Sequence, residues 1–140
     1  MKVKTFEDLQ VWKDARKFVK SIYELTSMKK FKKDYGLKDQ IQRAAVSIMN
    51  NISEGFERNN NREYKNFLGY AKGSAGEVRS MLYIAFDLNY ISQSEFDAIY
   101  KNSVNIITKI SNFKKYLNNY ILNEKLKNVK TFILQIISIN

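Results

Sequence analysis

The chain has 140 residues, is 44% apolar and carries 24 Lys and Arg against 14 Asp and Glu, a net charge of +10, so it is long enough to fold as one domain around a modest core. It contains no proline, cysteine or histidine, which excludes disulfides, thiolate nucleophiles and zinc–cysteine sites and removes the commonest general base and transition-metal ligand. A domain this basic attracts polyanions, meaning nucleic acid or an anionic membrane surface, unless its lysines form only a solvated surface.

The first predicted helix begins near Thr5 and runs to about Met28, because apolar residues recur there at three- and four-residue steps. Thr5 with Asp8 three residues later forms a weakened capping box, in which Asp stands where Glu or Gln is preferred. A basic connector follows at residues 28–36, and Gly36 marks its end. The connector carries four lysines, Lys29, Lys30, Lys32 and Lys33.

The second predicted helix runs from near Leu37 to near Arg58, and its apolar stripe is wide enough to contact more than one neighbour. Three asparagines, residues 59–61, predict a turn. The third predicted helix then runs from about Arg62 to Leu88, with an apolar face of the same helical period.

Asn89 is the predicted stop of the third helix, because Asn tolerates the left-handed conformation that ends helices. Ser92 or Ser94 can cap the fourth helix, and Glu95 lies in its first turn. The apolar rhythm of this helix continues to about Tyr120. Four long amphipathic helices joined by short loops predict an all-α, antiparallel up-down-up-down four-helix bundle over residues 1–122.

Residues 123–140 form a basic and apolar tail that could extend the fourth helix, pack on a neighbour or remain loose. We expect packing against the bundle or a neighbouring subunit in preference to an anionic membrane surface. Residues 1–10 contain no apolar targeting segment, and the apolar patch at residues 131–139 is too short to span a bilayer. The chain is therefore expected to be cytoplasmic.

Three of the five glycines lie within residues 69–77, inside the third predicted helix, although glycine weakens a helix interior by about 1 kcal/mol relative to alanine. Gly69 and Gly76 share a stripe of that helix with four cations, Arg62, Lys65, Lys72 and Arg79. The glycines could let another helix approach closely, or the stripe could face phosphates with the glycines leaving room for a nucleic-acid backbone. A solvated basic face is the remaining interpretation.

One side of the second predicted helix is polar and could be solvated or lie between subunits. With the adjoining flank of the apolar stripe, the candidate oligomer interface comprises Arg43, Met49, Asn50, Glu54 and Phe56. Glu54 also precedes Arg58 by four residues, a spacing that allows an ion pair within the helix.

Three stretches together point to a family: FEDLQVWKDAR at residues 6–16, YGLKDQIQRAAVSIMNNISEGFER at 35–58, and EYKNFLGYAKGSAGEVRSML at 63–82. In order and spacing they resemble the four-helix bundle proteins encoded in intervening sequences of bacterial 23S rRNA genes, and LNYIS at 88–92 resembles the loop before that family's last helix. The resemblance covers roughly residues 5–122. Members usually have proline where this chain has Met49, and residues 123–140 have no counterpart.

The resemblance implies a small bundle that assembles into a ring-like homopentamer. A similar branch of the family is the accessory protein of diversity-generating retroelements, a basic pentameric barrel that associates with nucleic acid and a reverse transcriptase. The family supplies no catalytic residue to carry over. Carboxylate-bridged metal bundles need Glu-x-x-His pairs, and the acidic residues here have the spacing of ordinary surface charge, so we expect no enzyme activity, metal or cofactor.

The leading hypothesis is a non-enzymatic oligomeric scaffold that binds RNA or DNA electrostatically and with little sequence specificity. The stripe of four cations on the third helix would be the main contact, and the four connector lysines would come second. The alternative is a protein-interaction module that docks a partner protein, such as a reverse transcriptase, with its charge serving solubility or steering.

Overall fold

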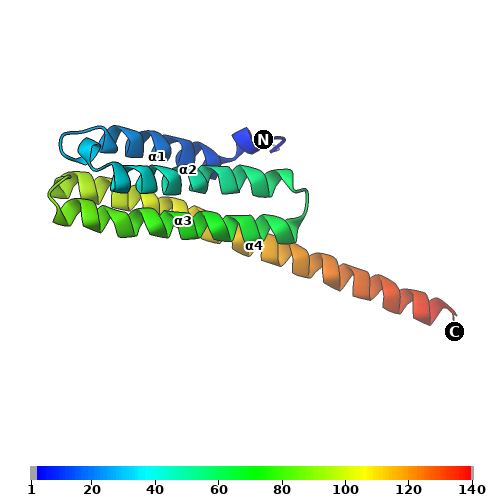
Figure 1. Cartoon of the computed structure of the whole chain (residues 1–140). Coiled ribbons are helices and arrows are strands. Elements are labelled where there is room, and N and C mark those ends of the chain that lie inside the picture. Colours follow the sequence, from blue (N-terminus) through cyan, green and yellow to red (C-terminus); the bar gives the residue numbers. More distant parts are fainter. Residues whose placement is uncertain (1–2, 140) are drawn as a thin grey trace.

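The computed structural model describes the backbone of residues 3–139 and the side chains of residues 3–138. Its elements are a 3₁₀ turn η1 (Phe6–Asp8), α1 (Gln10–Thr26), a second 3₁₀ turn η2 (Phe31–Lys33), α2 (Tyr35–Glu57), α3 (Asn61–Asp87) and α4 (Gln93–Ile139). Each long helix runs antiparallel to the one before it (Figure 1). α2 packs on α1 and α3, and α4 packs on α3 and α1, so α1 and α3 lie diagonally across the bundle.

The expected start of the first helix at Thr5 is wrong, because the capping box closes the η1 turn and not α1. The Thr5 N–H donates to Asp8 Oδ2 at 3.1 Å, and the Lys4 N–H donates to the same atom at 2.9 Å. These backbone donors lower the pKa of Asp8. Leu9 is extended, with φ −68° and ψ 124°, and separates η1 from α1.

Gly36 does not end the connector as predicted, since α2 begins at Tyr35 and Gly36 lies in its first turn. Asp34 is the N-cap, with its Oδ1 accepting from the Leu37 N–H at 3.0 Å. The Tyr90 hydroxyl donates to Asp34 Oδ2 at 3.0 Å and so ties the connector to the α3–α4 loop.

The α3–α4 turn follows the prediction. Asn89 has φ 57°, in the left-handed region. The Glu95 N–H donates to Ser92 Oγ at 3.1 Å while the Ser92 N–H donates to Glu95 Oε1 at 2.9 Å, a reciprocal capping box. The Ser92 N–H is the largest cause of the lowered pKa of Glu95.

The α2–α3 contact is built around Gly55, which is buried. A Cβ atom at Gly55 would lie 2.6 Å from Tyr64 Cδ2 and 2.8 Å from Phe67 Cβ. Tyr64 also packs edge-on against Phe56 and Phe113, at centroid distances of 6.2 and 5.0 Å. The packing of α3 on α2 at this end of the core therefore requires glycine, which has no side chain, at position 55.

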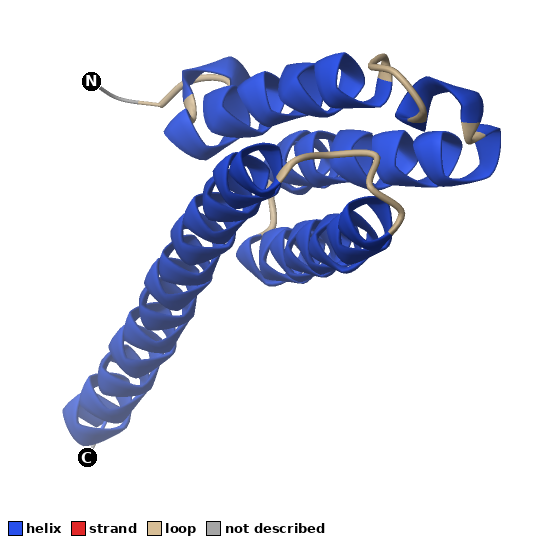
Figure 2. Cartoon of the chain, turned by 90° about the vertical axis from the view of Figure 1, so that its left-hand side faces the viewer, coloured by secondary structure: helices blue, strands red, loops and turns tan. Residues whose placement is uncertain are grey.

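α4 does not end near Tyr120 but continues as one helix to Ile139, so the first of the three alternatives for the tail is the one observed. After Asn118, which still accepts a hydrogen bond from Lys65 of α3, the helix leaves the other three and projects past the end of the bundle (Figures 1 and 2). Residues 122–138 are all exposed. Of the two kinds of packing that the sequence favoured for the tail, packing against its own bundle is wrong, and packing against a neighbouring subunit stays a prediction. None of the helices described between residues 3 and 139 has the length and apolarity that a membrane crossing requires.

Candidate nucleic-acid interface

The predicted basic stripe lies on the flank of α3 that meets α4. Arg62 and Lys72 are exposed, whereas Lys65 and Arg79 are half-buried and bond to α4. Lys65 Nζ donates to Asn118 Oδ1 at 2.9 Å. None of the four cations forms an ion pair with another described residue, so their charges are not compensated by a close carboxylate.

Arg79 holds α3 to α4. Its Nη2 donates to the Tyr100 hydroxyl at 3.0 Å, and its guanidinium carbon lies 4.9 Å from the Tyr100 ring centroid. Its Nε is buried and has no hydrogen-bond partner among residues 3–138. Arg79 is therefore a packing residue as well as a candidate phosphate ligand.

Two of the three glycines of α3 do not serve helix packing inside the chain. Apart from the helix backbone and sequence neighbours, no described atom lies within 4 Å of the Cβ position of Gly73 or Gly76. At Gly69 the nearest atom is Lys114 Nζ from α4, at 3.2 Å from the Cβ position. The close-approach interpretation is thus wrong within one chain, and Lys114 adds a fifth cation beside the stripe.

The connector lysines form a separate group. All four, Lys29, Lys30, Lys32 and Lys33, are exposed on and before the η2 turn, and Lys29 has φ 42°. η2 is anchored by Phe31, which is fully buried and lies 5.5 Å from the Tyr90 ring, centroid to centroid. The group lies at the end of the bundle where α3 terminates, whereas α3 begins at the other end (Figure 1), with Arg62 in its first turn.

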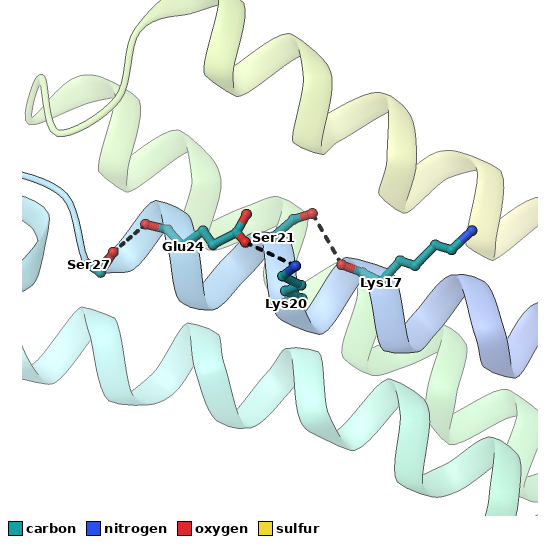
Figure 3. Close-up of polar contacts among 5 residues, drawn as sticks. All are labelled: Lys17, Lys20, Ser21, Glu24 and Ser27. Carbon is teal, nitrogen blue, oxygen red and sulfur yellow. Dashed lines mark hydrogen bonds and ion pairs between the residues drawn. The ribbon is translucent and has the colours of Figure 1, made fainter.

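The structure reveals a second basic face, on α1, that the sequence reasoning missed. It surrounds half-buried Trp12 and a surface hollow of about 580 Å³. Its cations are Lys13, Arg16, Lys17 and Lys20. Lys20 Nζ lies 3.7 Å from Glu24 Oε1, and Figure 3 shows Lys17 extending away from that pair. The spacing of these four residues at i, i+3, i+4 and i+7 is the sequence signal that could have identified this face.

A smaller cleft of about 220 Å³ separates α1 from α4. Within it the Lys109 ammonium pairs with the Asp14 carboxylate. Burial alone would raise the pKa of Asp14, but hydrogen bonds from Lys109 and Gln10 outweigh burial and lower it. Lys109 is therefore a compensated charge and adds little attraction for phosphate.

The candidate oligomer interface on α2 divides into two parts. Arg43, Asn50 and Glu54 are exposed around a shallow hollow. Met49 and Phe56 are half-buried and pack against the chain's own core. The predicted Glu54–Arg58 pair is confirmed, with Oε1 and Nη2 2.8 Å apart. The polar part of this set is the more exposed part and offers most of its free surface.

No group of three His, Cys, Asp or Glu side chains in the described part of the chain is placed to hold a metal ion.

Comparisons with known proteins agree on the type of fold. The profile of the 23S rRNA-intervening sequence protein family matches residues 7–112, a range that ends before the projecting part of α4. A crystal structure of a protein with unknown function from the S23 ribosomal protein family of Bacteroides thetaiotaomicron is similar, with a TM-score of 0.70 and 23% identity over 75% of this chain and 95% of that chain. At that identity the likeness concerns the fold alone. A search of the curated proteins found no match.

Proposed function

Because the chain belongs to the 23S rRNA-intervening sequence protein family, we propose that it is a non-enzymatic, oligomeric scaffold that binds RNA or DNA through phosphate contacts. The observation that carries this proposal is the row of uncompensated cations along the α3–α4 seam, the α3 stripe with Lys114. At 1.5 Å per residue, Arg62 and Arg79 span about 26 Å of α3, a length over which a nucleic-acid strand presents several phosphates.

The contacts would be electrostatic and largely independent of sequence. Lysine and arginine side chains displace counterions from phosphates, so affinity falls steeply as salt rises. Gly73 and Gly76 leave the α3 backbone uncovered, which lets a phosphate backbone approach beside Lys72 without displacing a side chain. The Lys65 and Arg79 hydrogen bonds to α4 preorganise two of the cations.

Assembly into a homopentameric ring belongs to the same proposal. The exposed polar part of α2 around Asn50 and the open face at Gly73 and Gly76 are the surfaces that would meet neighbouring subunits or the nucleic acid. Several copies in one ring would multiply a modest site, because linked sites act at high effective concentration.

The deciding experiment is light scattering after size exclusion, repeated with a short RNA strand and a DNA duplex of the same length across a salt series. A pentamer that takes up nucleic acid and releases it steeply with salt is the expected result. A pentamer that ignores nucleic acid at physiological salt contradicts the binding part, and a monomer contradicts the ring.

Two variants with equal loss of charge locate the contact. The seam variant carries Arg62→Gln, Lys65→Gln, Lys72→Gln and Lys114→Gln, and the control variant carries Lys13→Gln, Arg16→Gln, Lys17→Gln and Lys20→Gln on α1. For duplex DNA the seam variant should reduce the slope of log affinity against log salt by about 3 to 4 per subunit, and the control should reduce it much less. Equal reductions would show that net charge alone, and not the seam, drives binding.

The second candidate function is a protein-interaction module, and the hollow on α2 favours it. There Arg43 Nε lies 2.8 Å from Asp39 Oδ2, and Tyr23 of α1 forms part of the wall. Both signs of charge are paired at this surface, which suits a polar protein partner better than phosphate. Binding of a partner protein that persists after nuclease treatment and at high salt, and that the Asn50→Arg variant loses, would support this function over the first.

A further inference from the structure

The projecting part of α4 carries a band of exposed apolar side chains with nothing packed on them in the chain. Eight large apolar residues within 122–138 are 46% to 66% exposed. They are Leu122, Leu126, Val129, Phe132, Ile133, Leu134, Ile136 and Ile137. Scattered exposed apolar residues are normal, but a contiguous band of this kind marks an interaction surface.

This band is not an extension of the bundle core. The α4 core residues, such as Ile99, Ile106 and Ile110, lie on one side of the helix. At about 100° per residue, the band from Leu122 to Ile137 is rotated by about 130° from that side. Glu124, Asn128, Thr131 and Gln135 continue the core side of α4 instead, so an extension of the same bundle would meet polar residues.

Between residues 131 and 138 the apolar and polar residues lie on separate sides of the helix. Residues 132, 133, 134, 136 and 137 occupy an arc of about 200°, and Thr131, Gln135 and Ser138 occupy the remainder. Two helices in a coiled coil bury only a narrow seam, which would leave Leu134 and part of this arc in water. A flat apolar medium covers the whole arc.

The charges of this segment select an anionic surface. Lys125 and Lys130 lie on the two sides of the line formed by Leu122, Leu126, Val129 and Ile133, and Lys127 lies further round, against a single acid, Glu124. In a parallel pair of tails, Lys125 of one copy would face Lys130 of the other, because residues five apart flank the apolar seam. Lysines at the edges of an apolar face instead reach the headgroups of an anionic membrane while their stems cover apolar surface.

We propose that residues 122–138 of α4 form an interfacial helix that docks this protein on an anionic lipid membrane, with its apolar band in the headgroup–acyl boundary. The net charge of +10 on the chain adds long-range attraction to such a surface. This proposal is independent of nucleic-acid binding, since it uses neither the α3 stripe nor the α1 face.

The test is co-sedimentation of the nuclease-treated full chain with vesicles of phosphatidylcholine alone or mixed equally with phosphatidylserine. The apolar variant carries Phe132→Gln, Ile133→Gln and Ile136→Gln, and the matched control carries Thr131→Gln and Ser138→Gln on the polar side of the same turns. We expect binding to the mixed vesicles only, a loss of about 100-fold in the apolar variant and no loss in the control. Lys125→Gln with Lys130→Gln should weaken binding more than Lys127→Gln.

The proposal is overturned if neither vesicle retains the protein, or if the apolar variant binds as well as the parent, since the bundle's basic faces would then be the contact. It is also overturned if the apolar variant changes the mass of the protein in solution while vesicles have no effect. In that case a second copy of the chain covers the band.

Discussion

Replacement of Gly55 by alanine tests the closest helix–helix contact in the bundle. The added Cβ would lie 2.6 Å from Tyr64 Cδ2 and 2.8 Å from Phe67 Cβ, well inside van der Waals contact. Phe67 Cβ is fixed to the α3 backbone, and the Tyr64 ring is confined between Phe56 and Phe113. Neither neighbour can give way cheaply, so α2 and α3 must move apart.

The net effect is a difference between two opposing terms. Because neither neighbour gives way, overpacking this buried site should cost about 2 to 3 kcal/mol, the upper part of the usual range, and alanine recovers about 1 kcal/mol of helix propensity over glycine. Gly55→Ala should therefore lower the free energy of unfolding by about 1 to 2 kcal/mol and the melting temperature by about 4 to 8 °C. Gly73→Ala and Gly76→Ala meet open space and should each raise the free energy of unfolding by up to about 1 kcal/mol.

Urea unfolding followed by circular dichroism measures all three variants, at one protein concentration because assembly adds to apparent stability. A Gly55→Ala protein as stable as the parent would refute the close approach of α3 to Gly55. If Gly73→Ala or Gly76→Ala lowers stability in a concentration-dependent way, another subunit covers that face, and the close-approach interpretation would hold between subunits.

The buried Tyr64 hydroxyl has no hydrogen-bond partner among residues 3–138, and burial raises the pKa of Tyr64. The folded state therefore keeps this proton when the unfolded chain loses it, and stability should fall above about pH 10 by up to about 1.4 kcal/mol per pH unit. Tyr64→Phe should remove that loss and should raise the free energy of unfolding, measured with urea at about pH 8, by about 1 kcal/mol. If the stability of this variant fell above about pH 10 as steeply as that of the parent, the reasoning would be contradicted. Asp34→Ala should lower the free energy of unfolding by about 2 kcal/mol, because it removes the N-cap of α2 and the hydrogen-bond acceptor of Tyr90 together. Tyr90→Phe removes only the hydrogen bond and should lower it by about half as much in the same assay. Arg79→Met should lower the free energy of unfolding by about 1 to 2 kcal/mol, because it removes the contacts of Arg79 with Tyr100. The control is Lys72→Met at an exposed position, whose free energy of unfolding, measured by calorimetry, should lie within about 0.5 kcal/mol of the parent.

Local signals in the sequence were enough to predict the helices and several of their ends. The apolar period placed four helices in order, and Asn89 and Ser92 ended and began helices as expected. These features depend on residues within one or two turns of each other, so they can be read from the chain. Competing local signals explain the errors at Thr5 and Gly36, where a 3₁₀ turn and an Asp34 cap were equally compatible with the sequence.

The residues of the candidate interface could also be predicted from the sequence, but their contacts with other helices could not. The α3 stripe was identified from spacing alone, as was the Glu54–Arg58 pair. The α1 face carries an equally plain spacing, which went unrecognised beside the glycine-rich stretch of α3. Met49 of the candidate oligomer interface is half-buried against the chain's own core, which the helical wheel did not indicate, because a wheel does not say which neighbour covers each flank.

The sequence by itself determined the helical period, the caps and the excess of positive charge, since each follows from residue type and near-neighbour spacing. Only the tertiary structure decided that Arg79 meets Tyr100, that Lys114 reaches Gly69, that Gly55 admits Tyr64, and that the end of α4 packs on nothing in its own chain. Those outcomes depend on the rotation and distance of one helix against another. Rotation and distance are set by the packing of the whole core, which no local stretch of the chain encodes.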